Sequence, residues 1–245
     1  MNLKAFIPNL FTTANLCCGI LAIEASLNFD WPQVALLIIL ANVFDFLDGF
    51  MARLLKAGSA VGAQLDSLAD MVTFGVAPGI ICWKWLGLIN NSGFNWLPYV
   101  AFAIPIFAAF RLAKFNVDDR QTTHFIGLPT PANALLIMSL PIIGSGLFAD
   151  WGIFSAEVGL IFQSVFISST TLALLILLLS LLMVAELPLF ALKFKDFNFI
   201  NNKTRYTFLL ISLVLLVSFA FMAIPIIILL YLVISIIQHT IFKQL

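Results

Sequence analysis

Four aspartates at helical spacing are the residues most suited to chemistry in this sequence: Asp45, Asp48, Asp66 and Asp70. The chain has only 12 acidic residues among 245, so four of them within residues 45–70 form a marked concentration. At about 100° per residue, the two members of each pair share one face of a helix. Carboxylate oxygens gathered in this way are the ligands that hard divalent cations prefer.

Convergence of these four carboxylates would require a compensating positive charge, because like charges repel one another strongly away from water. Two divalent cations would neutralise them, and we predict Mg²⁺ or Mn²⁺ bound by all four aspartates. Neither His nor Cys occurs within residues 45–70, which argues against zinc. Magnesium readily bridges phosphate oxygens, so the pattern favours a pyrophosphate substrate.

Small residues and one cation accompany the aspartates. Gly49, Ala52 and Gly62 would leave a flat wall where a planar ring or a phosphate can approach the helices closely. Arg53 lies next to that wall and can bind phosphate in a bidentate way. For an isolated glycine, helix packing is the usual explanation. Here glycine recurs beside acid on both segments, which favours ligand binding.

The elements that carry these residues are predicted to lie in a membrane. Apolar residues make up 62% of the chain and mean hydropathy is +1.09, well above a soluble domain at about 45–50% apolar. The net charge of zero leaves no polycationic surface for nucleic acid. Since a spanning helix needs about 20 apolar residues, we predict an all-α, polytopic bundle of eight transmembrane helices. They lie near residues 8–28, 32–55, 61–84, 97–118, 130–149, 165–187, 206–222 and 225–243, with a turn at 222–225 between the last two.

The distribution of basic residues predicts the orientation. With eight spans both termini share one side, and all the basic residues except Lys84 fall on that side. The positive-inside rule makes this side cytoplasmic, in a cell (inner) membrane. Four tryptophans are expected at the outer interface as an aromatic belt: Trp83, Trp85, Trp96 and Trp151.

The second and third predicted helices form an antiparallel pair, because only a short turn with Gly58 and Ser59 joins them. Their carboxylates can therefore meet in the cytoplasmic half of the bundle. A charged residue within a membrane helix costs on the order of 2.5–3.5 kcal/mol and usually serves a function. A cation path through a transporter is one alternative explanation of such acids.

The aspartates belong to the pattern D-x2-D-G-x2-A-R-x8-G-x3-D-x3-D, which residues 45–70 match at every fixed position. This pattern resembles the signature of the CDP-alcohol phosphatidyltransferases. The resemblance implies a six-helix core that binds a CDP-linked lipid or alcohol, a dinuclear metal site and a homodimer. It implies that Asp45, Asp48 and Asp66 are metal ligands, and that Asp70 is the general base and also touches metal.

Segments around the motif are similar to those of the membrane-integral phosphatidylserine synthase branch of that family, over roughly residues 5–135. The similar segments are 7–16, 70–78, 111–116 and 125–132. This similarity implies transfer of a phosphatidyl group from CDP-diacylglycerol to L-serine, with release of CMP. The chain is then one transmembrane catalytic domain, 1–245, with a core of about 1–187 and two extra helices at about 206–243. Its partners are these substrates and membrane lipids, with no nucleic acid.

Polar residues on three helices complete the predicted substrate sites. Thr12 and Asn15 form a polar strip that can donate to ribose or phosphate, although an interhelical hydrogen bond would also explain them. Thr73 shares the face of Asp66 and Asp70 and is assigned to the same CDP-lipid site. Arg111 and Lys114 are predicted to hold the serine carboxylate; a snorkelling anchor is the alternative.

Three rival functions are weighed at this point. A transferase of the same family could use glycerol phosphate or inositol phosphate as the acceptor, and its site should then hold more cations. A membrane prenyltransferase also uses paired aspartate-rich helices, but the D-G-x2-A-R run and the spacing of Gly62 argue against it. A cation-coupled transporter is the alternative that is not an enzyme.

Overall fold

The computed structural model describes residues 3–118, 125–147, 168–189 and 202–242. Within them nearly all residues are helical, and the only strands are two of two residues each. The helical elements are α1 (Leu3–Leu27), α2 (Trp31–Leu54), α3 (Ala60–Asp70), the π-helix η1 (Met71–Val76), α4 (Ala77–Ile89), η2 (Leu97–Phe102), α5 (Ala103–Val117), α6 (Thr130–Gly144), α8 (Ser169–Val184), α9 (Lys203–Phe219), η4 (Ala220–Met222) and α10 (Ala223–Phe242).

The predicted polytopic membrane bundle is confirmed. Five helical stretches are long and apolar enough to cross a bilayer, and α6 and α8 are shorter apolar helices. Large hydrophobic side chains such as Phe46, Leu68 and Phe110 stand exposed on the outside, as they would against lipid. Each of the eight predicted helices overlaps a helix of the described residues, while the predicted ends at 148–149, 165–167 and 243 lie outside them.

Several predicted boundaries differ from the structure: α1 begins at Leu3 and not at 8, and α6 ends at Gly144 and not at 149. The third helix runs on to Ile89 through α3, η1 and α4, beyond the predicted end at 84. The turn expected at 222–225 lies earlier, where η4 begins at Ala220, whose φ is 49°. Pro225 is the third residue of α10, and the first turn of a helix tolerates proline because its N–H groups lack intrahelical partners.

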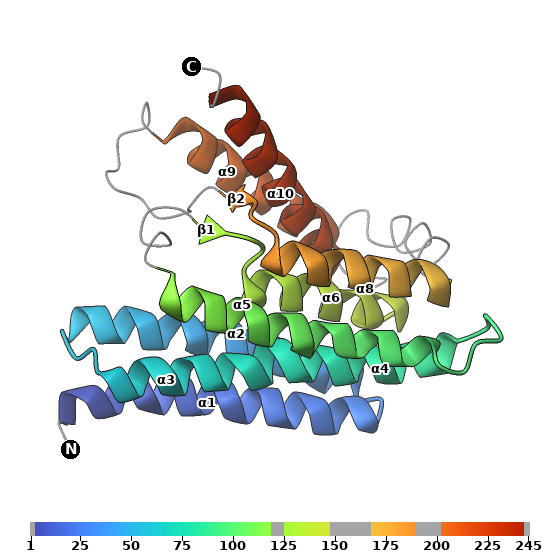
Figure 1. The fold of residues 1–245 in the computed structure, drawn as a ribbon, viewed down its shortest axis with the longest axis horizontal. Helices are drawn as coiled ribbons and strands as arrows, with labels where there is room; N and C mark the ends of the chain where they lie inside the picture. Colours follow the sequence, from blue (N-terminus) through green and yellow to red (C-terminus); the bar gives the residue numbers. More distant parts are fainter. Residues whose placement is uncertain (1–2, 119–124, 148–167, 190–201, 243–245) are drawn as a thin grey trace.

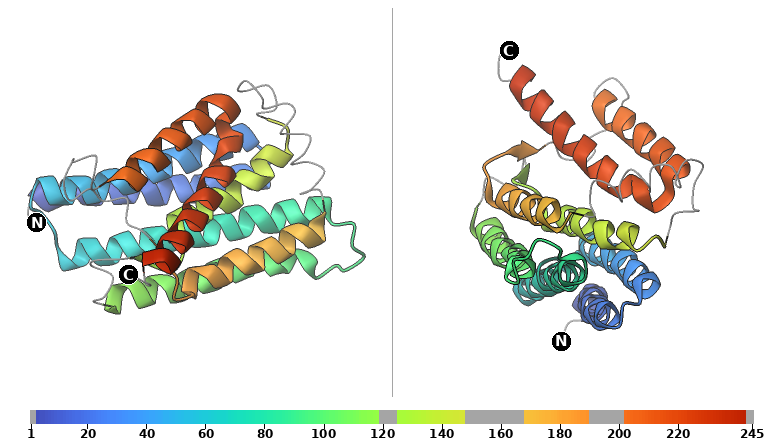
Figure 2. Two further views of the ribbon diagram at one scale, coloured as in Figure 1. Left: turned by 90° about the horizontal axis from the view of Figure 1, so that it is seen from above. Right: turned by 90° about the vertical axis from the view of Figure 1, so that its right-hand side faces the viewer.

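The helices form two groups in space. α1 to α6 and α8 run roughly along one direction and pack side by side, whereas α9 and α10 lie on one side of this bundle and cross it obliquely (Figures 1 and 2). α10 contacts α6 and the strand β2 (Pro188–Leu189), which pairs antiparallel with β1 (Phe125–Ile126). The four aspartates thus belong to the first group, away from the oblique pair.

Close packing holds the bundle together, since lipid tails are as apolar as the side chains and give little hydrophobic driving force. Phe74, Ile81 and Ile104 are completely buried between the central helices. Glycine lets the helices approach: a Cβ at Gly79 would lie 2.8 Å from Cδ of Pro105 on α5. The backbones of α4 and α5 therefore pack close to one another at this point.

The short connection between α2 and α3 determines at which end of the bundle their aspartates come together. The hydroxyl of Ser59 caps α3 by accepting a hydrogen bond from the backbone N–H of Gly62 at 3.0 Å. Only residues 55–59 separate the two helices. The two helices are therefore antiparallel, as predicted, but they are not direct packing neighbours, because each of them packs mainly against α1.

Candidate active site

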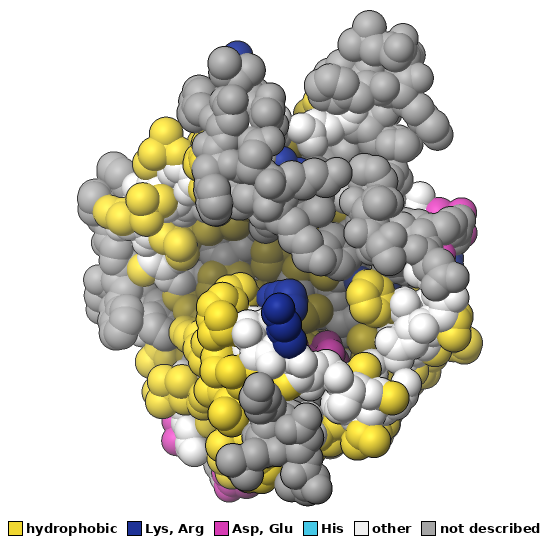
Figure 3. All heavy atoms as spheres, turned by 90° about the vertical axis from the view of Figure 1, so that its left-hand side faces the viewer, with side chains coloured by type: hydrophobic (Ala, Val, Ile, Leu, Met, Phe, Trp, Pro, Cys, Tyr) yellow, Lys and Arg dark blue, Asp and Glu magenta, His cyan; other side chains and the backbone are white. Residues whose placement is uncertain are grey.

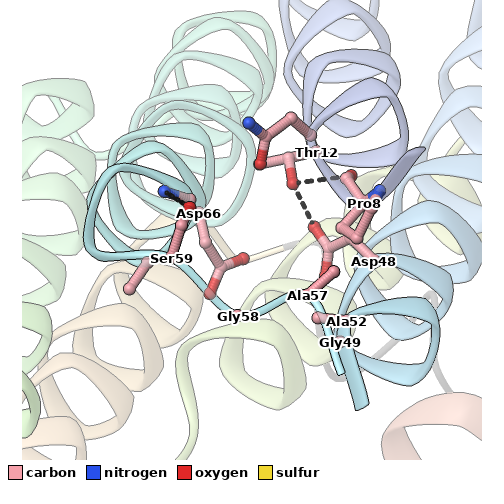
Figure 4. Close-up of a pocket in the computed structure, with 12 residues that line it drawn as sticks. Pro8, Thr12, Asp48, Gly49, Ala52, Ala57, Gly58, Ser59 and Asp66 are labelled. Carbon is pink, nitrogen blue, oxygen red and sulfur yellow. Dashed lines mark hydrogen bonds between the residues drawn. The ribbon is translucent and has the colours of Figure 1, made fainter. Parts of the chain in front are cut away.

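Three of the predicted aspartates converge between α2 and α3. Asp45, Asp48 and Asp66 each offer one carboxylate oxygen, and these oxygens all lie within 4.8 Å of one another. Figure 4 shows the Asp48 and Asp66 carboxylates facing one another from the two helices. Oxygens at this separation can share one hard cation as ligands.

Asp70 borders the cluster on its deeper side. It is one helical turn beyond Asp66, about 6 Å further along the helix at 1.5 Å per residue. Its carboxyl group lies within hydrogen-bonding reach of that of Asp45. From α1, Nδ2 of Asn15 donates to Oδ1 of Asp70 at 3.4 Å. All four predicted aspartates therefore line one continuous polar region.

Thr12 orients Asp48. Its hydroxyl lies 2.8 Å from Oδ2 of Asp48 and 3.2 Å from the Pro8 carbonyl oxygen (Figure 4). A hydroxyl has one hydrogen to donate, and the bond to a carboxylate is the stronger of the two. Both Thr12 and Asp48 are buried. In this structure the Thr12 hydrogen is therefore directed to Asp48, and its donation to a ribose or a phosphate stays a prediction.

The π-helix η1 begins directly after Asp70 and packs against α1. Inside it, the hydroxyl of Thr73 donates to the backbone carbonyl of Asn15 at 3.2 Å. A Cβ at Gly19 would lie 2.5 Å from Oγ1 and 2.8 Å from Cα of Thr73, so only glycine fits there. π-helical turns are frequent at functional sites. Here the turn fixes Asn15, which in turn contacts Asp70.

A cavity of about 160 Å³ adjoins the cluster. It is lined by Pro8, Asn9, Thr12, Asp48, Gly49, Ala52, Ala57, Gly58, Ser59, Gly62, Ala63 and Asp66. The three small residues predicted to form a flat wall are thus among its lining. Thr73 is not among them: it is buried against α1 beneath the cluster.

Asn9 and Ser59 are two polar residues of the cavity that were not predicted. A Cβ at Gly62 would lie 3.0 Å from both Oδ1 of Asn9 and Oγ of Ser59. Asn9 precedes Thr12 by three residues and so continues its helical face, a spacing that could have identified it. For Ser59 the capping pattern indicates a helix start but not a cavity.

The predicted phosphate-binding cation, Arg53, lies beside the wall of small residues. The Arg53 guanidinium lies over Gly49, 3.5 Å from where a Cβ would be, and its side chain is exposed. Figure 3 shows basic and acidic side chains meeting near the centre of this face. An arginine so placed can reach a phosphate in the cavity.

Arg111 and Lys114 separate in the structure. Arg111 is 6% exposed, and its Nε donates to the backbone carbonyl of Leu128 at 3.1 Å. Lys114 instead forms an ion pair of 3.2 Å with Glu186, whose side chain is 69% exposed. Neither lines the cavity beside Asp48. The guanidinium of Arg111 keeps further N–H donors for an anion, whereas Lys114 is engaged at the surface.

The donors of this region fit a hard divalent cation. All of the clustered ligand atoms are carboxylate oxygens. In addition, Oδ1 of the completely buried Asn15 has no hydrogen-bond partner among the described residues. A buried oxygen without a partner is costly unless a ligand, ion or water satisfies it. The cluster of three accommodates one ion, and the second predicted ion stays a prediction.

Fold and site together define the class of protein: an integral membrane protein with an all-oxygen carboxylate centre suited to phosphate chemistry. Comparison with known proteins identifies the family. Residues 5–192 match the family described as CDP-alcohol phosphatidyltransferase, and the chain belongs to that family.

Three curated relatives carry the name CDP-diacylglycerol--serine O-phosphatidyltransferase. The protein of Bacillus subtilis (strain 168) is 35% identical over 139 residues, which are 55% of this chain and 75% of that protein. The protein of Helicobacter pylori (strain ATCC 700392 / 26695) is 36% identical over 133 residues, 54% of this chain and 55% of its own length. The protein of Methanocaldococcus jannaschii is 39% identical over 132 residues, which are 54% of this chain and 58% of that protein. The chain thus spans little more than half of two of these three relatives.

Proposed function

We propose that this protein transfers a phosphatidyl group from CDP-diacylglycerol to the hydroxyl of L-serine, giving phosphatidylserine and CMP. The observation that carries the proposal is the convergence of Asp45, Asp48 and Asp66 beside a cavity walled by small residues. The names of the curated relatives support serine as the acceptor.

The cavity is proposed to take the cytidine diphosphate part of the lipid, while the acyl chains stay in the bilayer. Gly49, Ala52 and Gly62 allow the pyrophosphate and the base to approach the helix backbones. Divalent cations held by the aspartates would supply the positive charge that the pyrophosphate needs. Arg53 adds a cation that balances the charge of the leaving CMP.

Asp70 is proposed to accept the proton of the serine hydroxyl. The serine oxygen then forms a bond to the lipid-linked phosphorus, the bond from that phosphorus to the CMP oxygen breaks, and CMP leaves. Transfer of this kind depends mostly on positioning and charge neutralisation. Asn15 holds the Asp70 carboxylate from α1, and Thr12 fixes Asp48 in the cluster.

Orientation and assembly complete the proposal. The predicted excess of basic residues places the aspartate end and both termini in the cytoplasm, where serine is available. We propose a homodimer in the cell (inner) membrane, with residues 1–245 acting as a single catalytic domain whose core is about 1–187. The helices α9 and α10 lie beside this core.

An acceptor assay tests the proposal. Purified protein with CDP-diacylglycerol and Mg²⁺ or Mn²⁺ should release CMP when L-serine is added, and EDTA should abolish the release. Glycerol 3-phosphate and inositol phosphate, tested at the same concentration, should give little CMP. Faster release with either phosphorylated acceptor would reject serine. No release with any acceptor would favour a transporter.

The two cations of α5 should differ in their effect on serine. Arg111→Lys removes the planar guanidinium, so we expect the KM for serine to rise about tenfold or more, with a smaller change in the KM for CDP-diacylglycerol. Lys114→Gln breaks only an exposed ion pair and should change the KM for serine less than about threefold. Steady-state CMP release measures both. Equal effects of the two substitutions would contradict the assignment of the carboxylate to Arg111.

A further inference from the structure

A second cavity lies at the end of the bundle opposite the aspartates. Its volume is about 460 Å³, and it is lined by Phe29, Trp83, Lys84, Gly87, Leu88, Asn90, Asn95, Pro98 and Tyr99. Asp66 and Lys84 are 18 residues apart on one long helical stretch, roughly 27 Å at 1.5 Å per residue. That separation is close to the hydrocarbon thickness of about 30 Å. The two sites therefore lie at opposite membrane interfaces.

Lys84 is the cation of this cavity. Among the described residues no carboxylate lies within ion-pairing distance of it, and its Nζ is 4.5 Å from the centre of the Phe29 ring. A cation over an aromatic face is held in place without giving up its hydrogen-bond donors. Lys84 is also the one basic residue that the positive-inside sorting places on the outer side. A lysine merely extending to the interface would need neither the cavity nor the ring.

Phe29 adopts a backbone conformation that glycine normally takes. Its φ is 59°, at the end of α1, where the Asp30 N–H donates to the Ala25 carbonyl at 3.0 Å. This is the helix-ending position at which glycine dominates, and another residue there costs on the order of 1–2 kcal/mol. Such strain at a cavity is a reason to look for a function. Here it directs the aromatic ring beneath Lys84.

The rest of the lining matches an interfacial level. Trp83 stacks on Phe102 with ring centres 6.2 Å apart, and Tyr99 is exposed beside them. Tryptophan and tyrosine are enriched where lipid head groups begin. The predicted aromatic belt is partly wrong: Trp85 is buried and meets the Trp31 ring at 5.2 Å, while Trp151 lies outside the described residues. Trp83 and Tyr99 thus place aromatic side chains of the kind found at membrane interfaces in the lining of the cavity.

We propose that this cavity binds the phosphodiester head group of a phospholipid from the outer leaflet. Lys84 binds the phosphate, and the aromatic side chains contact the glycerol and the first methylene groups. The site is separate from the aspartate cluster, so the proposal does not depend on the transferase activity.

Lipid binding to the purified protein in detergent tests this proposal. Native mass spectrometry should show bound phosphatidylglycerol on the wild type, with affinity about tenfold lower in Lys84→Gln, because a charge-assisted contact is lost. Lys84→Arg keeps the cation and should retain binding. Phe29→Gly should also lower the affinity while keeping the fold, since glycine suits this φ.

Matched controls distinguish this site from general attraction to anionic lipid. Lys203→Gln removes one charge at the start of α9 and should bind phosphatidylglycerol as the wild type does. Equal binding by wild type, Lys84→Gln and Phe29→Gly would overturn the proposal. In a second arm, inorganic phosphate should not displace the lipid. If inorganic phosphate displaced the lipid, and did so only when Lys84 was present, the cavity would be a site for the free anion. That result would overturn the lipid assignment.

Discussion

Asp70→Asn should lower the rate of serine-dependent CMP release by about 10²–10⁴-fold, the usual contribution of a general base. Asparagine keeps the size of the side chain and can still meet Nδ2 or Oδ1 of Asn15 after an amide flip. It cannot accept the serine proton. Because the three clustered carboxylates of Asp45, Asp48 and Asp66 remain, binding of Mn²⁺ and of CDP-diacylglycerol should be largely retained.

Binding measurements beside the kinetics separate the base from a structural ligand. Mn²⁺ and CDP-diacylglycerol binding can be measured on the same purified variant by calorimetry. Glu24→Gln, which neutralises an exposed carboxylate on α1, is the control and should keep the wild-type rate. A rate near that of the wild type in Asp70→Asn would refute the base assignment. Loss of metal binding together with the rate would make Asp70 chiefly a ligand.

The sequence was sufficient to predict which helices carry the site and how they meet. Residues 55–59 leave room only for a tight connection, so the aspartates of α2 and α3 are brought to the same end of the bundle. Helical periodicity likewise predicted that Thr12 and Asn15 share one face of the first helix, and in the structure this face meets Asp48 and Asp70. These predictions rest on local geometry, which spacing along the chain determines.

Contacts between distant segments could not be predicted in this way. Lys114 and Glu186 are 72 residues apart, and nothing in their spacing indicates that they pair. The bond from Thr12 to Asp48 depends on the rotamers of two side chains from different helices. The π-helix after Asp70 has no periodic signal, because one extra residue in a turn leaves the hydrophobic pattern of a buried helix almost unchanged. Tertiary packing decides all three.

Gly19→Ala should lower activity although residue 19 does not line the cavity beside Asp48. The added methyl group would meet Thr73 at 2.5 Å from Oγ1 and at 2.8 Å from the backbone Cα, so a side-chain rotation cannot relieve the clash. α1 and η1 must move apart, which weakens the hydrogen bond from Thr73 to Asn15 and shifts Asn15 relative to Asp70. A displacement of 1 Å near reacting groups can cost about 10²-fold in rate. We expect CMP release at saturating serine to fall at least tenfold.

The same substitution should cost about 1–3 kcal/mol of stability, as overpacking usually does. Thermal unfolding in detergent measures this cost and shows whether the variant is still folded at the assay temperature. Ile20→Ala is the matched control: its side chain is exposed on the outside of α1, so rate and unfolding temperature should stay near the wild-type values. If Gly19→Ala kept the wild-type rate, the contact between α1 and the π-helix would not position Asp70. A folded variant with a lower rate but normal binding of CDP-diacylglycerol would show that helix packing here sets the geometry of the base.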